Sequence, residues 1–295
     1  MKPLLKTIIV LIVLVLAGFG LWEFIYFQKN VSENSANPLE TEQKDYKNIS
    51  YVIDGKSVDL KNGISEVEAV SGSASKIVTK YFGNVAAGDL NGDGINDTAF
   101  LLTQDGGGSG TFYYVVVALK TSDGYIGTNA ILLGDRIAPQ TTEIRNGYLI
   151  VNYADRAENE PMTTRPSMGK SKYLVVENNS LVETPIFIES PEKGMEISSP
   201  FIVSGVAKGL WYFEASFPVI LTDWDGRIIA QVPAQAQGDW MTTDYVPFSA
   251  EIKFVKPENP TNQEYAKRGF LIFKKDNPSG LPEHDDAREI PVVFK

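Results

Sequence analysis

Residues 98–119 read TAFLLTQDGGGSGTFYYVVVAL, and this stretch decides the fold class. Its two apolar ends, Thr98 to Thr103 and Thr111 to Leu119, are rich in the aromatic and β-branched side chains that favour strands. The glycine-rich segment from Asp105 to Gly110 is typical of a turn that joins two antiparallel strands. A phosphate-binding loop would need a following helix and a Gly-Lys-Ser/Thr ending, and both are missing. The stretch therefore predicts a β-hairpin.

The same pattern of short apolar runs between turn residues continues on both sides of this hairpin. Tyr51 to Ile53 precedes an Asp54-Gly55 turn. Only Glu66 to Tyr81 has room for a short helix, a prediction that Gly72 weakens. Further strands are expected at Ala130–Leu133, Thr141–Ile144, Tyr148–Tyr153 and Lys172–Val176. We therefore predict a mixed, mostly-β domain over residues 46–183.

A segment of alternating oxygen-bearing side chains carries the clearest chemistry of this region. It reads GDLNGDGIND from Gly88 onward. Calcium takes about 6–8 oxygen ligands, and a tight loop of alternating carboxylates can supply them. The expected ligands are the side chains of Asp89, Asn91 and Asp93, the carbonyl of Ile95, and Asp97, directly or through water. The apolar Ile95 side chain is expected to face the core. The alternative is a metal-free turn, because Asn, Asp and Gly also build turns for local reasons.

This loop resembles the calcium loops of integrin-type propeller repeats and of dockerin-like modules. It departs from a complete EF-hand because Phe100 stands where the bidentate glutamate would be. A propeller needs several copies of the unit, and one copy is present. Tyr81 to Leu133 also resembles an exported bacterial β module of unassigned function, with one calcium loop before a glycine-rich hairpin. That resemblance implies an architecture and no activity. A bound calcium ion is expected to be structural, because no acid/base group accompanies the loop in the sequence.

Residues 184–295 contain about seven short strand-like runs separated by turn signals, a pattern that suits an immunoglobulin-like β-sandwich. The side chains expected to form its core are Val203, Phe213, Phe217, Ile220, Trp240, Phe248, Phe254 and Phe270. Six blocks of this region, in this order and spacing, resemble the immunoglobulin-like module of bacterial spore-germination and cell-envelope proteins: Ser199–Ala207, Trp211–Phe217, Gly238–Thr242, Val246–Phe248, Asp276–Glu283 and Ile290–Val292. The resemblance implies an extracytoplasmic domain with a binding or scaffolding role, and it implies no catalytic residues.

Aromatic side chains in this region allow two interpretations. Trp211, Tyr212 and Trp240 could form a ligand-binding surface that stacks on sugar rings, or they could be ordinary core residues of a sandwich. His284, the one histidine of the chain, lies beside three carboxylates in a loop. It could be a metal ligand or a pH switch, and a solvated turn is the simpler reading.

The first 27 residues differ from the rest of the chain. Lys2 and Lys6 precede an apolar run from Ile8 to Tyr26, interrupted only by Glu23, which is close to the ~20 residues that a membrane-spanning helix needs. Both lysines lie before the run, so the N-terminus is expected in the cytoplasm and the body outside. The preferred prediction is a single-pass signal anchor that contacts cytoplasmic-membrane lipid. The alternatives are a cleaved signal peptide and a buried helix. Polar residues 28–45 are predicted to be a flexible tether.

Composition limits the remaining functions. The chain of 295 residues has no cysteine, one histidine and a net charge of −10, and without residues 1–27 the net charge is −11. Thiolate metal sites and cysteine nucleophiles are excluded, and nucleic acid is not an expected partner.

We therefore predict an all-β, membrane-anchored envelope protein without catalytic residues, whose partner is the cell wall or another envelope protein. An enzyme that acts on envelope polysaccharide or peptidoglycan through carboxylates is the first alternative. A sensor or inhibitor of a secreted protein is the second.

Overall fold

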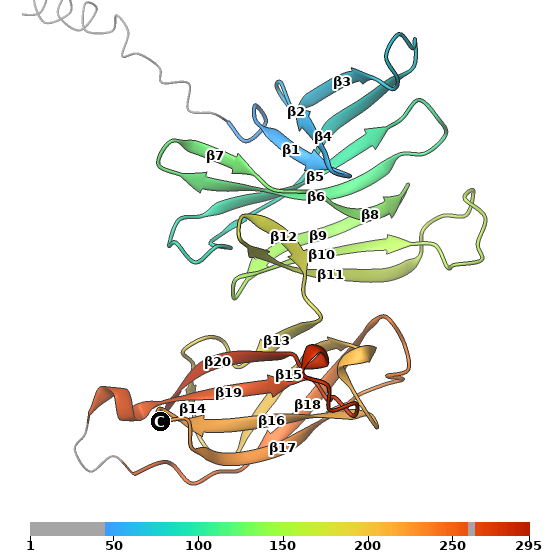
Figure 1. Ribbon diagram of the computed structural model, residues 1–295. Coiled ribbons are helices and arrows are strands. Elements are labelled where there is room, and N and C mark those ends of the chain that lie inside the picture. Colours follow the sequence, from blue (N-terminus) through green and yellow to red (C-terminus); the bar gives the residue numbers. More distant parts are fainter. Residues whose placement is uncertain (1–44, 259–262) are drawn as a thin grey trace, which may run out of the picture. The chain divides into compact units, whose positions relative to one another are not determined.

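The computed structural model describes residues 45–258 and 263–295, which form an all-β fold as predicted (Figure 1). Strands and loops make up this part of the chain, together with three short 3-10 helices. The predicted membrane helix (residues 1–27) and nearly all of the predicted tether (residues 28–45) lie outside the described residues. Within the described residues, no helix has the length and apolar character that crossing a membrane requires.

The first twelve strands form three antiparallel sheets. One is the hairpin β1-β2, one has four strands in the order β12-β11-β10-β9, and one has the order β3-β4-β5-β6-β7 with β8 also paired to β6. Their bounds are β1 (Ser50–Ile53), β2 (Lys56–Asp59), β3 (Ile64–Glu68), β4 (Lys76–Gly88), β5 (Asp97–Asp105), β6 (Phe112–Thr121), β7 (Gly124–Gly127), β8 (Ile131–Asp135), β9 (Ala138–Arg145), β10 (Tyr148–Asp155), β11 (Met168–Glu177) and β12 (Ser180–Glu183).

The predicted hairpin of residues 98–119 is confirmed as β5 and β6, which lie at the centre of the six-stranded sheet (Figure 1). Alternate residues of the two strands belong to two different cores. Phe100, Leu102, Tyr114 and Val116 pack with Tyr51 and Ile53 of the β1-β2 hairpin. The intervening Ala99, Leu101, Val115 and Val117 pack with Leu149, Val151 and Leu174 of the four-stranded sheet. The two strands are apolar without interruption because both of their faces are buried.

The short helix expected between Glu66 and Tyr81 is wrong. These residues form most of the hairpin β3-β4, with Ile64 opposite Lys80 and Glu68 opposite Lys76. The run Lys76 to Thr79 is rich in β-branched side chains, which favour a pleated strand. Gly72 has a φ of +79°, so it sits in the turn between the strands and not inside a helix.

The last eight strands form one sheet in the order β13-β15-β18-β17-β16-β19-β20-β14. Strands β17 and β18 share only two residue pairs, Gln235 with Ser249 and Ala236 with Phe248, so the sheet folds over at this point and encloses a core. The bounds are β13 (Ile186–Ser190), β14 (Glu196–Ile197), β15 (Phe201–Lys208), β16 (Ser216–Asp223), β17 (Ile228–Ala236), β18 (Tyr245–Ile252), β19 (Arg268–Lys274) and β20 (Ala287–Phe294), with 3-10 helices η1 (Gly209–Trp211), η2 (Glu264–Lys267) and η3 (Pro282–His284).

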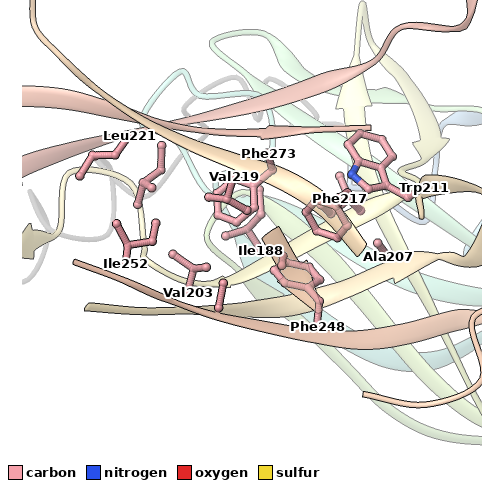
Figure 2. Close-up of a cluster of buried hydrophobic side chains, with 14 of the residues drawn as sticks. Ile188, Val203, Ala207, Trp211, Phe217, Val219, Leu221, Phe248, Ile252 and Phe273 are labelled. Carbon is pink, nitrogen blue, oxygen red and sulfur yellow. The ribbon is translucent and has the colours of Figure 1, made fainter. Parts of the chain in front are cut away.

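Aromatic rings fill the core of this sandwich (Figure 2). The ring centroid of Phe217 lies 5.0 Å from that of Phe248 and 5.3 Å from that of Tyr212. Val203, Phe217 and Phe248 are buried as predicted. Its most buried large side chains include Ile188, Val203, Trp211, Phe217, Val219, Leu221, Phe248, Ile252, Leu271 and Phe273.

Part of the predicted core is wrong by one residue in strand register. Strand β16 buries Phe217, Val219 and Leu221, so Ile220 lies on the opposite, half-buried face. Strand β19 likewise buries Leu271 and Phe273 and leaves Phe270 on the surface. Side chains alternate between faces with a period of two, so a shift of one residue exchanges the buried and exposed sets. Phe213 is also exposed, while Trp240 and Phe254 pack at the edge of the core.

Residues next to the connection between β12 and β13 make contacts between the first twelve strands and the last eight. Phe187 of β13 stacks on Tyr173 of β11, with 4.8 Å between ring centroids, and meets Tyr148 of β10 edge-on at 5.0 Å. Glu183, at the end of β12, forms ion pairs of 2.8 Å with Lys172 and with Lys208. Residues Lys44 to Lys295 accordingly form one compact unit.

Candidate functional site

The predicted calcium loop connects β4 to β5 and is held by its own hydrogen bonds. The carboxylate of Asp89 accepts hydrogen bonds from the backbone N–H of Gly92 (2.7 Å) and of Gly94 (2.9 Å). The side-chain oxygens of Asn91 and Asp93 each accept from the N–H two residues later, at 3.1 and 2.8 Å. These contacts fix the three side chains as turn-forming groups.

Asp97 has a different environment from the other predicted ligands. Its side chain is fully buried, and its two oxygens accept hydrogen bonds from the N–H of Leu90 (3.0 Å) and of Lys120 (2.9 Å). Burial raises the pKa of the Asp97 carboxyl above its ordinary value, and the charges of Asp93 and Asp89 act in the same direction, while the two N–H donors oppose them. Asp97 therefore anchors the loop to the start of β5 and to the end of β6.

The prediction that the Ile95 side chain faces the core is wrong, because 45% of its surface is exposed. Leu90 takes the inward position instead and packs in the core beneath the loop. The loop has two large apolar side chains, and Leu90 points inward while Ile95 points outward. The spacing of the sequence does not indicate which of the two is buried.

The donor atoms of this loop suit calcium in type, because Asp89, Asn91, Asp93 and Asp97 all offer oxygen. In the part of the chain that the structure describes, however, no three histidine, cysteine, aspartate or glutamate side chains are gathered closely enough to hold a metal ion. The side-chain oxygens are engaged with backbone N–H groups instead. The fit to calcium therefore rests on donor chemistry and spacing and not on a preformed cluster.

The three aromatic residues predicted as a ligand-binding surface are separated by the fold. Trp211 is 1% exposed and Tyr212 is 4% exposed, and the Tyr212 hydroxyl donates a hydrogen bond of 2.7 Å to the carbonyl of Val246. Both rings are packed in the core, and Figure 2 shows Trp211 there, so the ligand-stacking interpretation is corrected for these two residues. Trp240 is only partly buried and remains accessible at the edge of the sandwich.

A pocket of about 580 Å³ lies beside Trp240. Three segments line it: η1 with the residues that follow it, the loop between β17 and β18, and the loop between β19 and β20. The side chains that give it its character are Leu210, Phe213, Trp240, Met241, Asn277 and His284. The pocket combines apolar walls with a few polar groups, as small binding sites do.

Backbone contacts hold the walls of this pocket in place. The N–H of Gly209 donates to the carbonyl of Asp244 (3.2 Å), and the N–H of Asp276 donates to the carbonyl of Trp211 (3.1 Å). A Cβ atom on Gly209 would overlap the carbonyl oxygens of Thr242 and Trp240, so glycine is needed for this close approach.

The loop between β19 and β20 is braced in the same way. The Asn277 side-chain amide donates to the Leu281 carbonyl (2.8 Å) and to an Asp285 carboxylate oxygen (2.9 Å). His284 is exposed, and its Nδ1 lies 3.1 Å from the Ser279 hydroxyl. His284 is thus a wall residue of the pocket, and it belongs to no cluster of metal-binding side chains among the described residues.

Sequence reasoning missed the exposed apolar side chains Leu210, Phe213 and Met241. Phe213 was assigned to the core, and the other two were not singled out. The run Gly209-Leu210-Trp211 could have indicated the exposure of Leu210. Leu210 and Trp211 are neighbours in a three-residue turn, so Leu210 faces away from the core when Trp211 is buried.

Comparison with known families identifies the sandwich. Residues 185–266 match the model of a family described as the immunoglobulin-like domain of bacterial spore germination. The match runs from the start of β13 into η2, while β19 and β20 complete the same sheet beyond it. No curated protein and no solved structure matches the chain at a significant level. The C-terminal sandwich is therefore similar to the immunoglobulin-like domain of bacterial spore germination, as its sequence blocks predicted.

Proposed function

We propose that this chain is a non-catalytic binding or scaffolding protein of the bacterial cell envelope, anchored in the cytoplasmic membrane. The observation that carries the proposal is the match of residues 185–266 to an immunoglobulin-like domain of bacterial spore germination. Such sandwiches display loops at their ends for recognition, and the pocket beside Trp240 lies on loops of this kind. The acidic body fits a protein partner or a neutral surface better than an anionic one.

A retention experiment tests the binding role. Immobilised full-length chain is incubated with solubilised envelope proteins and, separately, with sheared cell wall. Retention of a defined envelope component supports the proposal, and no retention from either fraction contradicts it. Release of soluble fragments from the cell wall would point instead to the hydrolytic alternative.

Membrane anchoring rests on the apolar run from Ile8 to Tyr26 and on the two lysines before it. In this arrangement the N-terminus lies in the cytoplasm, and the β sheets lie on the outer side of the membrane. Protease added to intact cells is expected to degrade the body and to leave a short membrane fragment. Complete protection of the body would overturn this topology.

The role proposed for the loop of Asp89 to Asp97 is to bind one structural calcium ion. The support is the oxygen donor set and the buried Asp97, whose charge a cation would compensate. Calcium should raise the melting temperature of the full-length chain, and Asp93→Ala should abolish that increase. The matched control is Asp105→Ala, at the exposed end of β5 beside the glycine-rich turn. A melting temperature unchanged by calcium and by EDTA would contradict the proposal.

A further inference from the structure

We propose that the pocket beside Trp240 docks a protein segment that combines basic and apolar side chains. This inference rests on the binding role proposed above, and it names the chemistry of the partner. The surface is called the end pocket here, and it is formed by η1 with Tyr212 and Phe213, by residues 238–244 and by residues 275–286.

Three large apolar side chains of the end pocket are exposed to water. Leu210 is 77% exposed and Met241 is 78% exposed, although both are large apolar residues on fixed turns. Phe213 is 41% exposed and lines the same hollow. Leu210 also borders a second hollow of about 390 Å³, together with Lys208 and Asp286. Contiguous exposed apolar side chains with a polar border are typical of interaction sites.

Uncompensated negative charge surrounds this apolar surface. Among the described residues, five carboxylates on the segments that form the end pocket have no cationic side chain within ion-pair distance: Asp239, Asp244, Asp276, Glu283 and Asp285. Elsewhere in the sandwich, Asp223 and Glu251 are paired with Arg227 and Lys253, while Glu192 and Glu214 are among the carboxylates without an ion pair. Lys275 and Asp276 both line the pocket, and among the described residues neither has an ion-pair partner. The other four unpaired carboxylates lie on the flanking parts of the same segments, so these segments carry more unpaired negative than positive charge. Charge complementarity therefore favours lysine or arginine in the bound partner.

The same charges argue against the other ligand classes. Anionic envelope polymers would be repelled by the five carboxylates. A neutral glycan could stack on Trp240, but it would make no use of the acidic border or of the exposed Leu210 and Met241. A segment with both basic and apolar side chains uses all three features. The braced walls of the pocket also mean that little ordering is required on binding.

The test measures the binding of short fluorescein-labelled peptides to the full-length chain in non-ionic detergent by fluorescence anisotropy. The probe alternates arginine and leucine. Its comparison peptides carry glutamate or serine in place of arginine, and chitin oligosaccharide serves as the competing glycan. The arginine peptide is expected to bind, with a Kd that rises with salt, and the glutamate peptide is expected not to bind.

Two pairs of surface substitutions locate the site. Leu210→Ser with Met241→Ser removes apolar surface, and Asp276→Asn with Glu283→Gln removes charge. Each pair should weaken binding of the arginine peptide by about tenfold or more, the effect of losing one interface hot spot. The control pair is Val255→Ser with Glu251→Gln. Strand β18 begins at Tyr245, next to the end pocket, and runs to Ile252, so Glu251 and Val255 lie near the opposite end of the sandwich.

Each outcome decides the proposal. Weaker binding in both pocket variants, with the control pair unchanged and all variants unfolding at the wild-type urea concentration, supports it. Equal binding of the glutamate peptide, displacement by chitin oligosaccharide, or no binding of the arginine peptide would overturn it. Any of these three results would overturn the peptide-docking proposal alone. The proposed envelope-binding role is tested independently, by the retention of envelope proteins or cell wall on the immobilised chain.

Discussion

Gly209→Ala is the substitution with the clearest expected effect, because the structure leaves no room for a Cβ atom at this position. The new atom would overlap the carbonyl oxygens of Thr242 and Trp240, which are backbone atoms. The loop of residues 238–244 would have to retreat by about 1 Å or more to restore ordinary contact. That retreat would also lengthen the hydrogen bond of 3.2 Å from the Gly209 N–H to the Asp244 carbonyl.

The expected loss of stability follows from these two contacts. Forcing an extra methyl group into a packed site costs about 1–3 kcal/mol, and losing a hydrogen bond costs about 1 kcal/mol. We therefore expect the free energy of unfolding to fall by about 2–4 kcal/mol, which moves the urea midpoint by roughly 1–2 M without changing the slope.

Tryptophan fluorescence is a suitable assay for this change. Beyond residue 27, the tryptophans of the chain are Trp211, Trp224 and Trp240, all of which lie in the sandwich. Their emission therefore follows the unfolding of this part of the chain with little contribution from β1 to β12. Gly238→Ala is the matched control, because its added Cβ would meet only a Val246 methyl group at 3.9 Å. An unchanged midpoint for Gly209→Ala, or an equal loss in Gly238→Ala, would refute the reasoning.

Three further predictions concern buried or half-buried groups. Phe217→Ala should lower the free energy of unfolding by about 3–5 kcal/mol in the same fluorescence assay, because it empties the aromatic centre of the sandwich. The pKa of Asp97 is raised above its ordinary value of 3.8, so its contribution to stability is largest below pH 3.8 and declines as the pH rises through the folded-state pKa. Circular dichroism of urea unfolding should show that Asp97→Asn removes this slope. For Glu183, burial raises the pKa, but the ion pairs with Lys172 and Lys208 outweigh it and hold the pKa below its ordinary value of 4.5. The stability that Glu183 contributes should therefore be lost as the pH falls below about 4.5, and Glu183→Gln should remove that dependence.

The sequence predicted the strands well wherever side-chain pattern and turn chemistry agreed. The hairpin of β5 and β6 was clear because β-branched and aromatic runs flank a glycine-rich turn. What the pattern could not indicate is that both faces of this hairpin are buried, because a continuous apolar run does not say what covers each face. The paired strands β3 and β4 were mistaken for a helix for a related reason: Glu66 to Tyr81 contains few large apolar side chains, and its pairing partner is not visible in a local window.

The candidate sites were less predictable than the fold. The loop of Asp89 to Asp97 could be located by spacing, but the inward turn of Leu90 and the outward turn of Ile95 depend on the core beneath them. The end pocket could not be predicted, because its walls come from segments separated by more than 60 positions, as Phe213 and His284 illustrate. Trp211 and Phe213 are two residues apart, yet one is buried and the other is exposed. The intervening turn breaks the alternation on which the core prediction depended.

The pairing of the last strand has a consequence for the order in which the chain can fold. Strand β20 joins β14 in parallel, with Glu196 opposite Val293 and Ile197 opposite Phe294, so the first and last parts of the sandwich meet across about a hundred residues of chain. During synthesis the sandwich cannot close until its final residues have emerged, and until then β19 has a free edge.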